Sequence, residues 1–202
     1  MKIGLILFDY DENTNFEVYD YLIGVDKGAY NAFKNGIKLD LAIGDFDSIT
    51  LNQLSELSRF VKIIKLNPVK DLTDTEEALD YAMSLSNDIT ILGGIEGDRI
   101  EHLIANLNLF NKCNHLQIIN KYSKIFILDK SYTIKDDEYK FYSFFWYEGS
   151  PCISLKGFKY ELNNYLLAPH DSLCISNEII DNGSIDIKNG KILVIQTKND
   201  QN

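Results

Sequence analysis

Two aspartates one residue apart, Asp45 and Asp47, directly follow the apolar run at residues 41–43. If this run is a strand, both carboxylates point to the same side and lie about 6.6 Å apart along the chain. Like charges this close repel unless a proton or a metal ion offsets them, and Mg²⁺ is normally held by one or two carboxylates plus substrate phosphates. The spacing therefore indicates a metal site for phosphate chemistry, with a simple turn containing Asp, Gly and Ser as the alternative.

The first half of the chain alternates short apolar runs with helical patterns, which is typical of a mostly parallel sheet covered by helices. Strands are expected at residues 3–8, 21–25, 41–43, 61–66, 88–92 and 116–120. Helices are expected at residues 28–35, 51–59, 74–86 and 99–112. The predicted fold class is α/β, with a Rossmann-like, mostly parallel sheet and flanking helices in the N-terminal domain and an all-β sandwich in the C-terminal domain.

Acidic residues follow the predicted strands rather than precede them. In an open parallel sheet the carboxyl ends of the strands lie along one edge, where ligands bind in the crevice. We therefore expect one site built from the acids after the second, third and fourth strands, which are Asp26, Asp45, Asp47, Asp71 and Asp74. The alternative is that each is a loop acid or a helix cap, because Asp is favoured at helix starts for local reasons.

The predicted helix at residues 99–112 has a polar face near its start. At about 100° per residue, Arg99, His102 and Asn106 fall within about 60° of one another, whereas Glu101 falls away from them. A cation, an imidazole and an amide at a helix N-terminus suit an anionic ligand, and a solvated polar face is the alternative. A separate apolar stripe consists of Ile100, Leu103, Ile104 and Leu107.

Charge and cysteine content limit the class of protein. The formal net charge is -10 over 202 residues, which argues against a nucleic-acid partner because such binding relies largely on Lys and Arg. Cys113, Cys152 and Cys174 are odd in number and lack the spacing of a metal site, so a reducing cytoplasm is expected. The apolar start is too short for a signal peptide, and no run is long enough to span a membrane. We expect a cytoplasmic protein with no membrane partner.

After residue 120 the pattern changes to short β-rich runs separated by turn residues. Asn189 and Gly190, between two such runs, predict a hairpin turn of type I′. We expect an α/β domain at residues 1–122 and a β-sandwich domain at residues 123–202. The expected strands of the second domain are residues 124–128, 141–147, 152–155, 173–176, 183–187 and 191–196.

Several motifs, in this order along the chain, carry a resemblance to a known family. In the first half they are residues 24–29 (GVDKGA), 40–48 (DLAIGDFDS), 70–74 (KDLTD) and 94–106 (GIEGDRIEHLIAN). In the second half they are residues 157–164 (GFKYELNN) and 176–178 (SNE). Together these segments resemble the thiamine pyrophosphokinase family, and the resemblance extends from about residue 21 to the end of the chain.

The resemblance implies transfer of a pyrophosphoryl group from ATP to the hydroxyethyl group of thiamine, which gives thiamine diphosphate and AMP. It also implies Mg²⁺ as cofactor and a homodimer with active sites between the subunits. By position it implies Mg²⁺ ligands that also serve catalysis at Asp45, Asp47 and Asp74, with further catalytic residues at Asp71 and Arg99. The implied nucleotide contacts are Asp26, Asp71, Arg99 and His102. The implied substrate contacts are Glu101, Asn106, Ser176 and Asn177.

The chain departs from the family pattern at three places. Residues 8–12 lack the glycines that are usual in the family's first loop, Asp98 stands where glycine is usual, and Glu101 stands where Asp is usual. Two other functions are therefore considered. One is pyrophosphoryl transfer to another hydroxymethyl heterocycle, such as a pterin. The other is a non-catalytic sensor that binds thiamine or a nucleotide.

Overall fold

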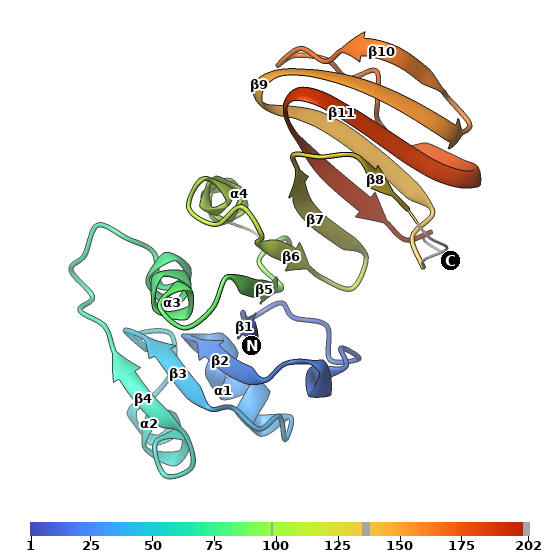
Figure 1. Cartoon of the computed structure of the whole chain (residues 1–202). Helices are drawn as coiled ribbons and strands as arrows, with labels where there is room; N and C mark the ends of the chain where they lie inside the picture. Colours follow the sequence, from blue (N-terminus) through green and yellow to red (C-terminus); the bar gives the residue numbers. More distant parts are fainter. Residues whose placement is uncertain (98, 135–137, 200–202) are drawn as a thin grey trace. The chain divides into compact units, whose positions relative to one another are not determined.

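The chain divides into two units, Met1–Lys121 and Tyr122–Asn202 (Figure 1). A computed structural model describes residues 1–97, 99–134 and 138–199. Within these residues, no helix combines the length and the apolar character that are needed to cross a membrane.

The first unit carries a parallel sheet with the strand order β6-β5-β1-β2-β3-β4. Each pair of neighbouring strands in this order is parallel. The predicted α/β fold class is confirmed, and the six predicted strands form with small shifts at their ends. Their bounds are β1 Lys2–Ile6, β2 Tyr21–Val25, β3 Leu41–Gly44, β4 Lys62–Lys65, β5 Asp88–Leu92 and β6 Gln117–Ile119.

Local sequence signals explain where the helices of this unit begin and end. The Thr50 side chain accepts a hydrogen bond from the Gln53 backbone nitrogen, and the Gln53 side chain accepts one from the Thr50 backbone nitrogen. These two hydrogen bonds form a capping box at the start of α2. Gly36, with φ of 76°, follows α1 as a C-terminal glycine. The bounds are η1 Phe16–Val18, α1 Lys27–Lys34, α2 Leu51–Leu57, α3 Asp74–Met83, α4 Ile100–Asn108 and η2 Leu109–Asn111.

The core of the first unit lies on both faces of its sheet. All four residues of β3 are buried, and because successive side chains of a strand point to opposite faces, both faces are covered. On one face, Ala42 of β3 packs in a cluster with Ala29 of α1 and Leu57 of α2. With the faces covered, the carboxyl edge of the strands remains for a ligand.

The second unit is an antiparallel arrangement of strands in the order β10-β9-β11-β7, with β8 paired to β11. One core cluster contains residues from both halves of the long strands, such as Phe144 and Leu155 of β9 and Ile185 and Val194 of β11. The predicted all-β unit is therefore confirmed. The bounds are β7 Ser123–Leu128, β8 Tyr132–Thr133, β9 Phe141–Phe158, β10 Leu162–Leu166 and β11 Asn177–Thr197.

The predicted hairpin at Asn189 and Gly190 is wrong. Both residues lie inside β11, which pairs with β9 on either side of a register shift between Lys188 and Gly190. A type I′ turn needs positive φ at both central residues, but only Asn189, with φ of 64°, has it. The left-handed residue thus serves a bulge in a long strand. The separate strands predicted at 141–147 and 152–155, and at 183–187 and 191–196, merge in the same way, and residues 173–176 form turns.

Asn177, at the start of β11, connects two segments of the second unit. Its side-chain oxygen accepts hydrogen bonds from the backbone nitrogens of Tyr160 and Glu178, at 3.0 Å each, and its Nδ2 donates to the Tyr160 carbonyl at 2.8 Å. Only 2% of its surface is exposed. The buried amide therefore ties the backbone of Tyr160 to the start of β11 through part-buried hydrogen bonds, whereas its neighbour Ser176 is exposed.

We expect Asn177→Ala to destabilise the second unit by roughly 1–3 kcal/mol, because it leaves part-buried backbone groups without their partners. Ser176→Ala is the matched control and should change the free energy of unfolding little. Trp146 is the one tryptophan of the chain and lies in β9, so denaturant unfolding followed by its fluorescence reports on this unit. Equal midpoints for the two variants would contradict the structural role of Asn177.

Candidate functional site

A pocket of about 710 Å³ lies in the first unit beside the carboxyl ends of β1, β2 and β5. Its walls include polar side chains from several loops and helix starts. Among the residues predicted for the site, it is lined by Asp26, Asp74, Arg99, His102 and Asn106. The parallel sheet thus brings together side chains that are far apart in the sequence, as the edge argument predicted.

The two aspartates of the DFD segment lie just beyond β3. The strand ends at Gly44, and Phe46 is buried with a φ of 59°, an unusual backbone conformation for a bulky residue. The Asp47 backbone nitrogen donates to Asp45 Oδ1 at 3.1 Å. The segment is therefore a turn rather than a continued strand. The buried side chain of Phe46 fixes this turn, with Asp45 on one side of Phe46 in the chain and Asp47 on the other.

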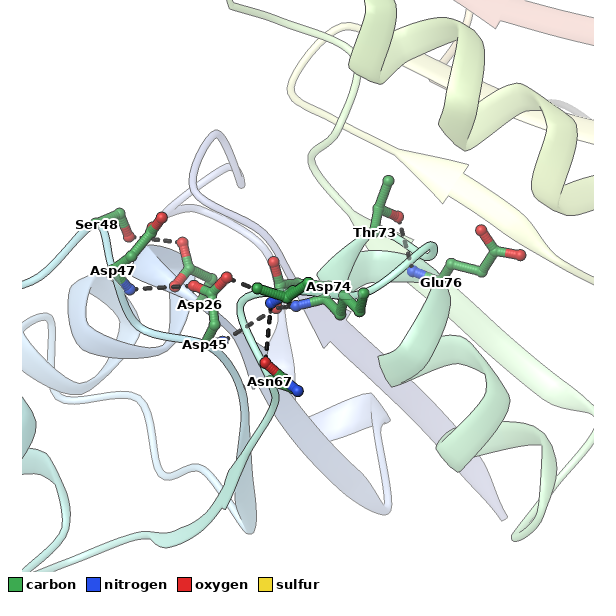
Figure 2. A network of polar contacts seen from close by, with 10 residues as sticks. Asp26, Asp45, Asp47, Ser48, Asn67, Thr73, Asp74 and Glu76 are labelled. Atoms are coloured by element: carbon green, nitrogen blue, oxygen red, sulfur yellow. Dashed lines mark hydrogen bonds and ion pairs between the residues drawn. The ribbon is translucent and has the colours of Figure 1, made fainter.

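Asp26 faces this turn from the end of β2. Carboxylate oxygens of Asp26, Asp45 and Asp47 all lie within 4.8 Å of one another. One Asp26 oxygen, Oδ2, accepts a hydrogen bond from Ser48 Oγ at 2.6 Å. The other, Oδ1, is buried and has no hydrogen-bond partner among the described residues, which is unusual for a charged oxygen. Figure 2 shows these groups converging.

Asp74, at the start of α3, is connected to the cluster through the backbone nitrogen of Asp45 and the ammonium group of Lys70. Its Oδ1 accepts a hydrogen bond from the Asp45 backbone nitrogen at 3.1 Å (Figure 2). The same oxygen accepts a hydrogen bond from Lys70 Nζ at 2.9 Å. Lys70 Nζ also lies 3.6 Å from Asp45 Oδ2. Burial lowers the pKa of the Lys70 ammonium, but its contacts with Asp74 and Asp45 outweigh this and raise the pKa overall. Lys70 therefore stays charged and offsets part of the negative charge.

The start of α4 contributes the predicted cationic residue and imidazole. Arg99 and His102 line the pocket, but Arg99 Nε donates to Glu101 Oε1 at 2.8 Å. Glu101 is exposed and does not line the pocket. Asn106 is buried, and its Nδ2 donates to the Gly94 carbonyl at 2.9 Å. The amide predicted to contact a substrate thus supports the loop before the helix.

Asp45 and Asp47 do not line this pocket themselves, but they lie beside Asp26, which does. The other predicted residues also lie outside it. Asp71 is exposed and does not line it. Ser176 and Asn177 belong to the second unit, where Asn177 binds backbone groups as described above. Asp98 falls outside the described residues.

Two residues that contribute to this region were given no role from the sequence. Lys70 lies in the segment KDLTD, and its position four residues before Asp74 is a spacing that can signal an ion pair. Asp9 follows β1, and its carboxylate accepts hydrogen bonds from three consecutive backbone nitrogens, those of Gly94, Ile95 and Glu96. No local signal in the sequence indicates that contact, because it joins loops about 85 residues apart.

The fold and the site together define a class of protein. A parallel α/β sheet presents a pocket that Asp26, Asp74 and the start of a helix line, with the other clustered carboxylates and Lys70 beside it. This arrangement suits a ligand that carries phosphates with a hard metal ion.

Comparisons with known proteins give the family. The family model described as "Thiamin pyrophosphokinase, catalytic domain" matches residues 14–122, and "Thiamin pyrophosphokinase, vitamin B1 binding domain" matches residues 131–193. Thiamine pyrophosphokinase of Bacillus subtilis is 34% identical over 189 residues, which covers 87% of this chain and 86% of that relative.

Solved structures agree with this. The crystal structure of the Bacillus subtilis enzyme superimposes with a TM-score of 0.84 and 30% identity, covering 98% of this chain and 100% of that chain. A thiamin pyrophosphokinase family protein from Enterococcus faecalis gives a TM-score of 0.87 and 26% identity, with coverage of 98% and 100%. This chain belongs to the thiamin pyrophosphokinase family, and its activity is the pyrophosphorylation of thiamine. The predicted family, enzyme class and function are confirmed.

The pKa of Asp47 leads to a test of the carboxylate cluster. The negative charge of Asp45, then burial and the charges of Asp26 and Asp74, raise the pKa of the Asp47 carboxyl. A raised pKa means that ionised Asp47 disfavours the folded state, so the cost is present at neutral pH and disappears as the pH falls below the ordinary value of 3.8.

We therefore expect Asp47→Asn to raise the melting temperature of the protein in EDTA at pH 7.5 by roughly 1–3 °C. Adding Mg²⁺ should raise the melting temperature of this variant less than it raises that of the wild type. Asp80→Asn is the control, because Asp80 pairs with Lys112 outside the pocket and its loss removes an attraction. An Asp47→Asn protein less stable than the wild type in EDTA would refute the repulsion.

Proposed function

We propose that this chain transfers the pyrophosphoryl group of ATP to thiamine with Mg²⁺ held by Asp26, Asp45 and Asp47, beside Asp74. The observation that carries the proposal is the convergence of three carboxylates within 4.8 Å, one of them with a buried oxygen that lacks a partner among the described residues. A cation in this position would satisfy that oxygen and remove the repulsion between the carboxylates.

The donor set fits magnesium. All candidate ligand atoms are carboxylate oxygens, which hard divalent cations such as Mg²⁺ prefer, and histidine and cysteine are absent from the described cluster. When bound, the ion would draw phosphate oxygens to the site and offset the charge that develops during transfer.

This arrangement modifies the ligand set expected from the family resemblance. Asp26 was assigned to the nucleotide, and Asp74 to the metal ion. In the structure Asp26 completes the close group, whereas Asp74 holds Lys70 and the Asp45 backbone. We propose that Asp74 orients Asp45 and contacts the ion from outside the group formed by Asp26, Asp45 and Asp47.

The other residues of the pocket bind and position the substrates. Arg99 and His102, at the start of α4, face the pocket where backbone N–H groups and the helix dipole favour anions. We propose that they contact the phosphates, and that Arg99 exchanges its contact with Glu101 for a phosphate oxygen. Such a chain does little covalent chemistry itself, so positioning and electrostatics provide most of the catalysis. The proton of the thiamine hydroxyl would pass to Asp71 or Asp74.

Thiamine binding is proposed to involve the second unit. The vitamin B1 binding family model covers residues 131–193, which include exposed Ser176. We propose that Ser176 contacts thiamine and that Asn177 supports it through the backbone. The same match favours thiamine over a pterin or another heterocycle as the acceptor.

We also propose a cytoplasmic homodimer with active sites between subunits. Ile100 and Ile104 of α4 are 69% and 57% exposed, and a second copy would remove such apolar surface from water. Sedimentation velocity at micromolar concentration tests this, and a monomer would exclude it. Free Cys113 and Cys174 are buried, and burial raises the pKa of Cys174 to about 11, which fits inert thiols in a reducing compartment.

Wild-type protein with Mg²⁺, ATP and thiamine should form AMP and thiamine diphosphate, and EDTA should stop the reaction. Asp47→Asn should lower turnover at least about a hundredfold, because it removes a ligand of the ion while the fold remains stable. Asp80→Asn should keep nearly full turnover. Chromatographic detection of AMP and ADP decides: ADP as the product, or near wild-type turnover of Asp47→Asn, contradicts the proposal.

A further inference from the structure

The loop between β5 and α4 has a backbone shaped to bind an anion. Gly93, Gly94 and Gly97 have φ values of 96°, 78° and 122°. Three consecutive backbone nitrogens, those of Gly94, Ile95 and Glu96, point to one place. Successive N–H groups arranged in this way form a nest that binds phosphates and carboxylates.

In this protein a side chain of the chain itself occupies the nest. Asp9 Oδ1 accepts a hydrogen bond from the Gly94 nitrogen at 2.6 Å, and Asp9 Oδ2 accepts from the nitrogens of Ile95 and Glu96 at 3.1 and 2.9 Å. The approach is close, because a Cβ at Gly93 would lie 2.7 Å from Asp9 Oδ1. Charge-assisted hydrogen bonds of this kind are among the stronger ones in proteins.

Two further contacts hold the same loop. Buried Asn106 donates to the Gly94 carbonyl at 2.9 Å, and Asn120 Nδ2 donates to Glu96 Oε1 at 2.6 Å. The Gly93 nitrogen donates to the Ile119 carbonyl at the end of β6. The loop is thus held by residues at or just after the ends of β1 and β6 and by a residue of α4. Of the side chains that hold it, that of Asp9 is the charged one.

The loop forms part of the pocket in which ATP is proposed to bind. Gly94, Ile95, Glu96 and Gly97 line this pocket together with Asp9, and the chain then leads to Arg99 and the start of α4. The conformation of the loop therefore decides where Arg99 and the N–H groups of the helix face the phosphates.

We propose that Asp9 is a positioning residue that acts as a built-in anion. Its carboxylate takes the place of a bound phosphate in the nest and holds the loop at residues 93–97 in the shape that receives the triphosphate. The inference rests on the proposed function, because it assigns ATP to this pocket.

Asp9→Ala should raise the KM for ATP about tenfold and change kcat less than about twofold, because the loop loses its anchor but the metal site remains. Asp11→Ala is the matched control: Asp11 lies in the same loop and its carboxylate accepts hydrogen bonds from Asn13. This control should keep the wild-type KM. A wild-type KM for ATP in Asp9→Ala overturns the proposal, because Asp9 would then have no effect on ATP binding. A lower KM also overturns it, because Asp9 would then be an anion that competes with ATP.

Formate provides a readout that does not depend on turnover. Asp9→Ala keeps the Cβ and vacates a space of the size of a carboxylate, so formate should raise its melting temperature and restore its KM, and chloride at equal ionic strength should not. Asp9→Asn fills the space but presents an NH₂ group to amide donors, so it should show the raised KM without rescue by formate. This second variant serves if Asp9→Ala does not fold.

The outcomes separate the two proposals. If the wild type forms no AMP, the proposed function fails, and the formate shift of Asp9→Ala still tests whether Asp9 occupies the nest. If the wild type is active but formate does not shift the melting temperature of Asp9→Ala, the role of Asp9 is refuted.

Discussion

Repulsion between carboxylates is the interaction on which the site depends. The parallel sheet ends β2 and β3 side by side, and this brings Asp26, Asp45 and Asp47 within 4.8 Å of one another. Like charges at this distance would move apart in a flexible loop. They remain close because Phe46 is buried between the two aspartates of its turn and because Asp26 is fixed between the end of β2 and the start of α1. Folding energy thus maintains a cluster of like charges that a bound cation would stabilise.

The chain offsets this charge only in part. Lys70 contacts Asp74 and Asp45, and backbone nitrogens donate to Asp74 and Asp45. Asp26 receives one hydrogen bond from Ser48, and its buried oxygen has no partner among the described residues. Compensation is therefore partial, and the negative charge that remains at the cluster would favour a bound cation.

Asp9 shows the opposite use of the same functional group. Its carboxylate is satisfied by three backbone nitrogens, so it has little capacity left for a metal ion and instead shapes a loop. The acids near one edge of the sheet therefore divide into those whose carboxylates cluster with one another and one that holds the backbone of a loop. Residue type alone does not distinguish them, because the difference lies in which donors surround each carboxylate.

Patterns that repeat over short distances were readable from the chain itself. The alternation of apolar runs and helical patterns predicted the parallel sheet, and the position of the acids after the strands predicted their common edge. Contacts between distant segments were not readable in this way. Asn189 favoured a left-handed conformation in either case, but pairing with β9 placed it in a bulge instead of a hairpin. Asn177 and Asp9 became structural because backbone groups far along the chain, at Tyr160 and at residues 94–96, came to lie beside them. Local preference acts along a few residues, whereas the partners of a buried polar group depend on how the whole chain packs.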